Sequence, residues 1–304
     1  MYCELSYFIL ISICIPIYNF NVTKLVETLI HQGKELQHPF EIICIDDHSS
    51  DYFKKINAYV ETNENIQFFS LKKNIGRSKI RNMFIDISKF DKMLFIDCDC
   101  SISSDLFLKN YMDISNCDVI YGGRKHHQIK PKKSSERLRW RYGVKVEDQS
   151  FDFRLNNPYH SFRSNNFLIK KSVFKAIKFD ESFNGYGHED TLLALELQKN
   201  NIKIHQIDNP VYHEGIEKNT DFLLKTRSAI RNLSKIESKN YNISSLKLIN
   251  TYLKIKKLNL DKFLLLISKK GMIIIEKQLM SSWPSLRLFN LYKLLFYIRD
   301  QNNV

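Results

Sequence analysis

The sequence lacks a long hydrophobic run. No apolar stretch reaches the roughly 18 residues that a membrane-spanning helix needs, so an integral membrane protein is not expected. The apolar residues 5–17 have no basic start and continue directly into Tyr18 and Asn19, which is typical of a buried strand and not of a targeting segment. We expect a cytoplasmic location, with at most peripheral contact at the inner face of the membrane.

The sequence also lacks paired cysteines. It has six cysteines but no Cys-x-x-Cys motif, and most of the six lie in or beside apolar runs. This usage favours small buried side chains in a reducing compartment. A zinc site at Cys98 and Cys100 would need a second pair of ligands, and none is spaced for it.

Acidic residues are fewer than basic ones. The 304 residues are 43% hydrophobic, enough to bury a sizeable core, and carry a formal net charge of +13. Such a charge favours an anionic partner, whether nucleotide phosphates, acidic lipid headgroups or nucleic acid, or else a Lys-rich solvated surface. Because the basic residues are scattered and no nucleic-acid motif is present, we expect no nucleic-acid partner.

The first 215 residues alternate between strand and helix patterns. Strands are expected at residues 7–17, 40–45, 66–71, 93–96 and 118–121. An apolar face over 22–30 predicts a helix that Gly33 ends, and a basic helix contains Lys79 and Arg81. This alternation predicts an α/β fold with a mostly parallel central sheet flanked by helices.

Polar clusters follow these strands, where open α/β sheets bind their ligands. Tyr18, Asp47, Arg81 and Asp99 are therefore expected to meet in space although they are far apart in the chain. Asp97 and Asp99 flank Cys98, and alternation along a strand would put both carboxylates on one side. Mg²⁺ and Mn²⁺ prefer such oxygen ligands and share them with substrate phosphates.

Two further clusters contribute titratable groups. Glu189 and Asp190 precede a helix-forming run, so the helix dipole would keep them ionised, as a general base requires; a simple N-terminal cap is the alternative. His213 follows a short strand, where imidazole could complete a metal site begun by Asp99. Alone, such a histidine is more often a surface or hydrogen-bonded residue.

Two segments have weaker patterns. Residues 125–160 are irregular and charged, which favours a mobile loop over the active site. Beyond residue 215, helices are expected at 221–238, 244–257 and 286–299. The last is basic and aromatic, so it could lie on an anionic membrane, or pack on the catalytic domain or a second subunit. We favour membrane contact slightly.

Five motifs in this order resemble family 2 glycosyltransferases of the GT-A fold. They are Ile15–Asn19, Ile45–Asp51, Asn74–Asn82, Phe95–Asp99, and Phe179–Phe183 through Gly187–Asp190. The last is also similar to the C-terminal half of galactosyl- and N-acetylgalactosaminyltransferases. The resemblance implies a nucleotide-diphospho-sugar transferase fold over residues 1–215, followed by a helical C-terminal extension over 216–304.

The resemblance implies roles on the nucleotide side of the site. Pro16 and Tyr18 would line the nucleotide pocket. Asp47 would accept a hydrogen bond from uracil, and Asn74 and Arg81 would hold the base or ribose. The uracil contact favours UDP over GDP.

The resemblance also implies the metal and catalytic roles. Asp97 would touch the ribose or donor sugar, and Asp99 would bind Mn²⁺ or Mg²⁺ with His213 as second ligand. Asp190 would be the catalytic base, and Glu189 would orient the acceptor hydroxyl.

The acceptor side is expected at two further places. Asn165 and Asn166 would lie near the donor sugar or acceptor. Gly187 and His188 would shape the acceptor pocket, and His188 departs from the family pattern, which usually has glycine there. A bulkier side chain could narrow the pocket or contact substrate.

The expected function is inverting transfer of a hexose from a UDP-sugar to a glycan or lipid-linked hydroxyl, in surface polysaccharide synthesis. A divalent ion would neutralise the leaving diphosphate, and a carboxylate would remove the acceptor proton. A nucleotidyltransferase is one alternative, although it normally has a Gly-rich phosphate loop where Pro16 to Asn19 stand. A non-catalytic nucleotide-sugar-binding protein is the other.

Overall fold

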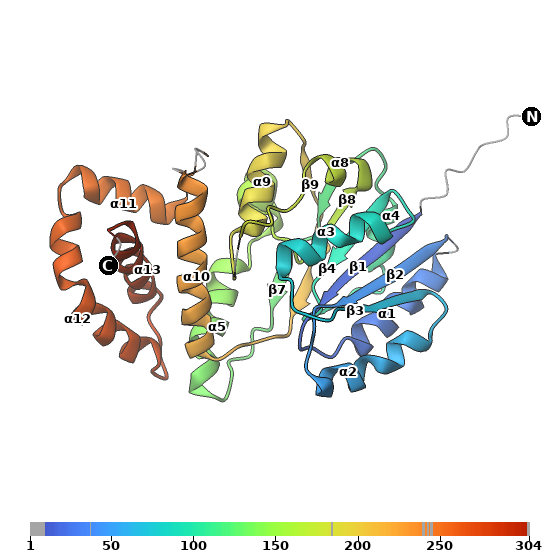
Figure 1. Ribbon diagram of the computed structural model, residues 1–304, viewed down its shortest axis with the longest axis horizontal. Coiled ribbons are helices and arrows are strands. Elements are labelled where there is room, and N and C mark those ends of the chain that lie inside the picture. Colours follow the sequence, from blue (N-terminus) through green and yellow to red (C-terminus); the bar gives the residue numbers. More distant parts are fainter. Residues whose placement is uncertain are drawn as a thin grey trace, which may run out of the picture. The chain divides into compact units, whose positions relative to one another are not determined.

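A computed structural model describes residues 10–36, 38–183, 185–238, 241, 243 and 246–302. The chain divides into two units (Figure 1). The first contains residues 1–125, 149–181 and 193–215, and the second contains 126–148, 182–192 and 216–304. Two segments that precede residue 215 thus belong with the C-terminal part of the chain.

The first unit is built on a seven-stranded sheet with the order β3-β2-β1-β4-β8-β6-β9. Its strands are β1 (Ile11–Ile17), β2 (Phe40–Asp46), β3 (Ile66–Ser70), β4 (Lys92–Ile96), β6 (Val119–Tyr121), β8 (Asn166–Lys170) and β9 (Ile204–Gln206). The strands β3, β2, β1 and β4 pair in parallel, as do β6 and β9, whereas β8 is antiparallel to both of its neighbours. The mostly parallel sheet is confirmed, but β8 was not predicted.

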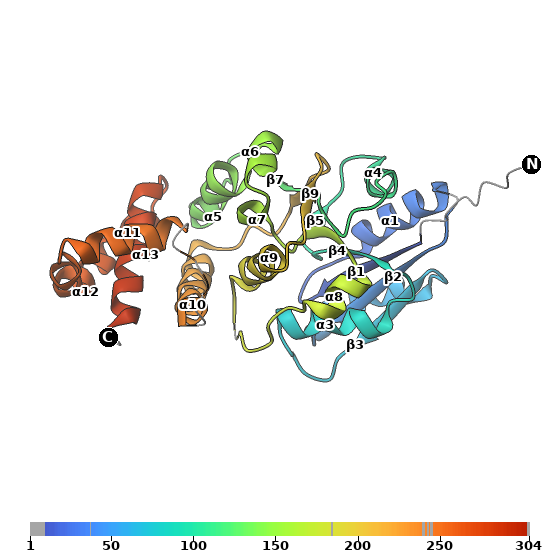
Figure 2. The same cartoon turned by 90° about the horizontal axis from the view of Figure 1, so that it is seen from above.

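Helices cover both faces of this sheet (Figure 2). They are α1 (Thr23–Glu35), α2 (Asp51–Asn57) with the 3₁₀ turn η1 (Ala58–Thr62), α3 (Arg77–Ile87), α4 (Phe107–Met112), α6 (Phe151–Asn156), α7 (Pro158–Ser161) and α8 (Lys171–Ala176). Helices α1 and α4 lie on one face, and α3 and α8 lie on the other.

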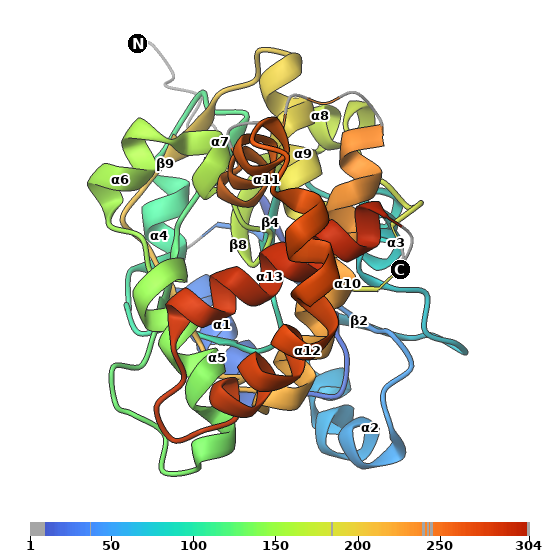
Figure 3. The same cartoon turned by 90° about the vertical axis from the view of Figure 1, so that its left-hand side faces the viewer.

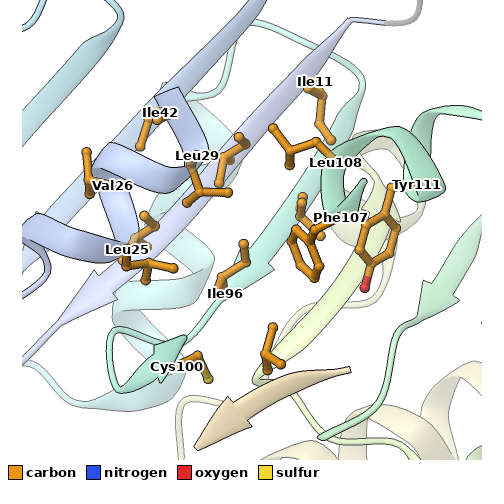
Figure 4. Packing of buried hydrophobic residues seen from close by; sticks show 14 of the residues in the cluster. Ile11, Leu25, Val26, Leu29, Ile42, Ile96, Cys100, Phe107, Leu108 and Tyr111 are labelled. Atoms are coloured by element: carbon orange, nitrogen blue, oxygen red, sulfur yellow. The ribbon is translucent and has the colours of Figure 1, made fainter. Parts of the chain in front are cut away.

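Strand alternation divides the core between the two faces. Ile11 of β1 lies in one cluster with Leu25 and Leu29 of α1 (Figure 4), as do Ile13 and Ile15. Cys14 belongs to the other cluster, which contains side chains of helix α3. All the strand side chains in this set are fully buried. Burying each large aliphatic side chain contributes about 1.5–3 kcal/mol, so a two-sided core of this kind holds the central strands in place.

Gly33 does not end helix α1, which continues to Glu35. A Cβ atom at Gly33 would lie 2.5 Å from Cζ of the Phe40 ring. The glycine therefore permits a close approach to the first residue of β2, and the prediction that it stops the helix was wrong.

Residues 125–160 are largely helical. They contain η2 (Ser134–Glu136), α5 (Arg137–Tyr142), a π-helical turn η3 (Gly143–Glu147), and helices α6 and α7. Leu138 is fully buried in the core of the second unit, and its N–H donates to Asn219 Oδ1. The prediction of an irregular loop was wrong, because this segment forms short helices and buries Leu138 in a core.

The second unit is helical beyond residue 216. Its helices are α10 (Asn219–Ser238), α11 (Lys247–Lys257), α12 (Asp261–Leu279) and α13 (Leu286–Gln301), while α9 (Glu189–Lys199) begins in this unit and ends in the first. Helices α10, α11 and α13 were predicted, although residues 244 and 245, at the expected start of α11, lie outside the described residues. Helix α12 was not predicted. Figure 3 shows α12 beside α13.

The apolar face of α13 is buried inside the second unit. Phe289, Tyr292 and Leu295 are at most 3% exposed and pack with Met272 and Ile275 of α12. The burial of these side chains favours the alternative that the last helix packs within the protein, and its contact with a membrane stays a prediction. Within the described part of the chain, none of the helices combines the length and apolar character needed to cross a bilayer.

Candidate active site

The first two motifs join each other at the carboxyl ends of β1 and β2. The Asn19 N–H donates to Ser49 Oγ at 2.8 Å, and the Ser50 N–H donates to Asn19 Oδ1 at 2.8 Å. Asn19 has φ +49°, a left-handed conformation that asparagine adopts more readily than most residues. Pro16 is the half-buried penultimate residue of β1, and Tyr18, just beyond, leaves 54% of its surface exposed.

Asp47 connects these loops to the third motif. Its Oδ1 accepts the Ile75 N–H at 2.7 Å, its Oδ2 accepts the Gly76 N–H at 3.0 Å, and its carbonyl accepts Asn74 Nδ2 at 3.1 Å. Gly76 has φ +88°, so glycine is required at this turn. Asp47, which is only 4% exposed, thus holds the loop in place, and any base contact would use its remaining lone pairs.

Arg81 and Asp97 form a nearly buried ion pair. Nη2 of Arg81 lies 2.5 Å from Oδ1 of Asp97, and the arginine side chain is 3% exposed. The guanidinium also lies 5.6 Å from the centre of the Phe179 ring. Arg81 therefore positions Asp97, and removing either partner would leave a charge that is costly to bury.

Asp97 and Asp99 lie in a turn and not on a strand. The Cys100 N–H donates to the Asp97 carbonyl at 3.1 Å, which bends the chain between β4 and the short strand β5 (Cys100–Ser101). The strand β10 (Val211–His213) pairs antiparallel to β5, with His213 opposite Cys100. A second sheet has the order β5-β10-β7, where β7 is Arg124–His126.

This pairing brings His213 to Asp99. Nε2 of His213 lies 3.2 Å from Oδ2 of Asp99, and the side chains are 12% and 31% exposed. Burial alone would raise the pKa of Asp99, but the charge and hydrogen bond of His213, with Arg77 and Arg124 nearby, hold it well below its usual range. Asp99 is therefore ionised at neutral pH.

The donor set here fits a divalent cation. One carboxylate and one imidazole are suitable ligands for Mn²⁺, and Mg²⁺ would use mainly the carboxylate. A Cβ at Gly215 would lie 3.3 Å from Asp99 Oδ2, so the glycine leaves room beside the carboxylate. Among the described residues, no three His, Cys, Asp or Glu side chains are grouped to hold a metal, so the remaining ligands would come from substrate and water.

In the second unit, helix α10 holds the turn before α9. Gly185 and Gly187 have φ +80° and +98° and pack against Ser228 and Ala229, where a Cβ would clash at 2.5 Å. His188 follows with φ +69°. This left-handed conformation explains why glycine suits the position; here the imidazole is held by Thr191 Oγ1 at 3.1 Å.

Glu189 and Asp190 occupy the first turn of α9, as predicted. Glu189 is 7% exposed, whereas Asp190 is half-buried. Oδ1 of Asp190 accepts the Thr191 N–H at 2.7 Å. Asp190 is thus more accessible than Glu189 to a substrate hydroxyl.

The two asparagines at the start of β8 differ. Asn166 is fully buried; its Nδ2 donates to the carbonyls of Gly123 and Asn209, both at 2.9 Å, and its Oδ1 accepts the Tyr111 hydroxyl. Asn165 is 4% exposed, and its carbonyl accepts the Asp97 N–H at 3.1 Å. Asn166 therefore joins three segments of the first unit, and a substrate contact of either side chain stays a prediction.

Sequence reasoning gave no role to Asn82 within the third motif. Its Nδ2 donates to the Phe179 carbonyl and Glu181 Oε1, both at 2.9 Å, and its Oδ1 accepts the Phe179 N–H at 3.0 Å. Asn82 thus joins the third motif to the fifth. A buried polar residue on the apolar side of a helix was the signal that could have found it.

His126, for which the sequence also indicated no role, lies in a buried charge network of the second unit. Its Nδ1 lies 2.6 Å from Asp148 Oδ1 and its Nε2 lies 3.4 Å from Glu147 Oε2. Arg139 donates to the same Glu147 oxygen at 2.8 Å, and Gly143 makes room for the imidazole ring. The network connects β7, α5 and η3.

The sequence of the chain is similar to that of known glycosyltransferases. The family model described as glycosyl transferase family 2 matches residues 12–178. The chain is 24% identical to chondroitin synthase of Escherichia coli over 248 residues, 69% of this chain and 36% of that protein. It is 33% identical to a poly(ribitol-phosphate) beta-glucosyltransferase of Bacillus spizizenii over 118 residues, 37% of this chain and 18% of that protein.

Solved structures show the same fold. A mannosyltransferase from Pyrobaculum calidifontis, solved in complex with GDP-Man and Mn²⁺, has a TM-score of 0.57 at 11% identity, covering 96% of this chain and 86% of that chain. Residues 1–349 of Staphylococcus aureus TarS have a TM-score of 0.50 at 17% identity, covering 96% and 90%. The match therefore confirms the expected GT-A fold, with its central sheet, flanking helices and C-terminal helical part.

The extent of these matches differs between family and relatives. The chain spans between 18% and 36% of the lengths of the first curated relatives. The family model, in contrast, covers more than half of this chain. The motifs after β1, β2, β3 and β4 all lie inside the matched residues. The chain belongs to glycosyl transferase family 2.

Proposed function

We propose that this chain transfers a sugar, with inversion, from a nucleotide-sugar to a hydroxyl of a glycan or lipid-linked acceptor. The observation that carries the proposal is the Asp99–His213 pair, 3.2 Å apart, just beyond the carboxyl end of β4. Family membership supports the reaction type. Relatives named as a chondroitin synthase and a poly(ribitol-phosphate) beta-glucosyltransferase support a polysaccharide as product. That this product belongs to the cell surface, and that the chain lies at the inner face of the membrane, are parts of the proposal.

The nucleotide would lie against the loops after β1, β2 and β3. Tyr18 has an exposed ring on which a base can stack, beside Pro16. Asp47 and Asn74 are hydrogen-bonded to each other in these loops. Asp47 would contact the uracil ring. Arg81 acts through Asp97, which would meet the ribose or donor sugar.

Asp99 and His213 would hold Mn²⁺ or Mg²⁺. When bound, the ion supplies charge neutralisation for the nucleoside diphosphate as it leaves. Mn²⁺ in the mannosyltransferase complex supports this cofactor. The chain's own contribution is an ionised carboxylate held in position by an imidazole and by the β5–β10 pairing.

Asp190 would take the proton of the acceptor hydroxyl as that oxygen attacks the anomeric carbon. It lies in the first turn of α9, at the positive end of the helix dipole. Glu189 would orient the hydroxyl, and Gly187 with His188 would shape the pocket. Asn165 and Asn166 would lie toward the sugars.

The test is calorimetric titration of UDP and of GDP, each with and without Mn²⁺. We expect UDP to bind only with the metal, and Asp99→Ala to lower that affinity by about tenfold or more. Asp105→Ala, at an exposed acid, is the matched control. Unchanged binding in Asp99→Ala would remove Asp99 from the metal site.

The reaction type needs a second readout. Incubation with UDP-sugars should release UDP, whereas a nucleotidyltransferase would use pyrophosphate and form UTP. Metal-dependent binding without turnover toward any supplied acceptor would favour the non-catalytic alternative. Tighter binding of GDP than of UDP would contradict the proposed contact between Asp47 and a uracil ring.

A further inference from the structure

Helix α12 has one buried side and one exposed side, and both are apolar. Ser268, Met272, Ile275 and Leu279 are at most 8% exposed and recur at helical spacing on the buried side, three of them in the core with α13. The opposite side, here called the α12 outer face, has five large apolar residues that are 44–81% exposed: Phe263, Leu266, Ile267, Ile273 and Ile274. Figure 1 shows the helix along one side of the α13 ribbon.

Such a face needs an explanation. The outer side of a helix that meets only water is normally polar, and contiguous exposed apolar patches mark interaction sites. The apolar surface continues into the link before the helix, where Leu258 is 67% and Leu260 is 47% exposed. The second unit therefore presents apolar side chains in a row along one element and its approach.

The charged side chains on the α12 outer face are all basic. Exposed lysines alternate with the apolar residues along the helix: Lys262, Lys269, Lys270 and Lys277. The two acids of the helix lie elsewhere, because Asp261 is half-buried at its start and Glu276 pairs with Arg227 at 2.6 Å. The preceding helix ends in Lys254, Lys256 and Lys257, which are exposed as well.

We propose that the α12 outer face docks on the surface of a lipid bilayer with anionic headgroups. Apolar side chains would enter the boundary between headgroups and acyl chains, while lysines extend their charged ends to the headgroups. A second copy of the chain fits less well, because it would bring lysines against lysines. The helix lies in the plane of the surface, in keeping with the lack of a spanning helix among the described residues.

The first experiment is co-sedimentation of the full chain with two kinds of vesicle. One kind is made of phosphatidylcholine alone, and in the other about a quarter of the lipid is phosphatidylglycerol. We expect binding that needs the anionic lipid and falls as salt is raised, since salt screens the attraction between the lysines and the headgroups. The double variant Leu266→Asp with Ile274→Asp should weaken binding by about tenfold or more. Ile129→Asp, at an 86% exposed residue of the same unit, is the matched control and should bind normally.

A second variant separates charge from apolar contact. Replacing the four lysines by glutamine should remove the preference for phosphatidylglycerol and leave the fold intact, as monitored by thermal unfolding. Equal binding of the double aspartate variant and the parent would overturn the proposal, as would equal, salt-insensitive binding to both kinds of vesicle. A parent dimer that the aspartates dissociate, with no vesicle binding, would assign the face to self-association instead.

Discussion

Asp97 and Asp99 are two residues apart in the chain, yet each has a different partner. Asp97 is held by the buried Arg81 at 2.5 Å, and Asp99 is held by His213 at 3.2 Å. The turn between β4 and β5 separates the two carboxylates, so they need not share one cation. At the scale of single residues, the site is therefore set by pairs of opposite charge that the sheet holds in place.

Asp190→Asn should abolish transfer and leave UDP binding nearly unchanged. The amide has the same shape but cannot accept the acceptor proton, so the rate should fall by about 10²–10⁴-fold. Activity is compared with calorimetric UDP affinity on the same preparation. Asp221→Asn, in the first turn of α10, is the matched control, and a variant that still transfers sugar would show that Asp190 is not the base.

Lys293→Met should stabilise the protein at pH 7. Burial and the nearby Lys247 lower the pKa of Lys293 to about 8, against a raising effect of Glu147. Because the unfolded chain keeps this proton up to its ordinary pKa of 10.5, stability should rise with pH between about 8 and 10. We expect a gain of roughly 1 kcal/mol in the free energy of unfolding at pH 7, shrinking toward pH 10 in urea titrations.

At the scale of elements, α12 and α13 differ in how much of their apolar surface the rest of the chain covers. The residues of α13 that look able to meet a membrane, such as Phe289 and Tyr292, are buried. Those of α12 that look able to fill a core, such as Leu266 and Ile274, are exposed. Helix periodicity reports how apolar a face is, but the partner of that face depends on contacts across the chain.

Phe289→Ala should destabilise the protein by about 3–5 kcal/mol, because it leaves a cavity among the aromatic rings of Tyr142 and Phe222. Leu291→Ala, two residues away and 37% exposed, is the control and should cost less than about 1 kcal/mol. Thermal and urea unfolding measure both. A small effect of Phe289→Ala would mean that α13 is not part of the core.

At the scale of the whole molecule, the hydrophobic clusters described in the two units contain neither Asp99 nor His213. The candidate metal residues lie beyond the carboxyl end of β4 and form an ion pair with each other. The cation should therefore matter for ligand binding and not for folding.

Removal of divalent ions with a chelator should abolish UDP binding and transfer while Tm changes by only about 2 °C or less. A shift of 2 °C corresponds to about 1.3 kcal/mol in the free energy of unfolding for a chain of this length. Differential scanning calorimetry and UDP titration with and without chelator provide the comparison. Unfolding on chelation would instead indicate a structural metal that the described residues do not reveal.

The sequence by itself determined the strands β1, β2, β3, β4 and β6 of the first unit and the position of the first four motifs after strands. Alternation and helical spacing are patterns among neighbouring residues, such as Ile13 and Cys14 in a strand or Leu25 and Leu29 in a helix, so they can be recognised without the tertiary structure. It also identified Asp99 and His213 as candidates. Their meeting required the β5–β10 pairing, which joins residues more than a hundred positions apart.

Only the tertiary structure decided the rest. It placed the antiparallel β8 inside the sheet and paired Arg81 with Asp97. It also brought Gly33 against Phe40, buried the apolar face of α13 and left apolar side chains of α12 exposed. Each of these depends on which distant segment approaches a given residue. Local patterns encode how strongly a side chain favours burial or a partner, whereas the identity of that partner emerges only when the whole chain is packed.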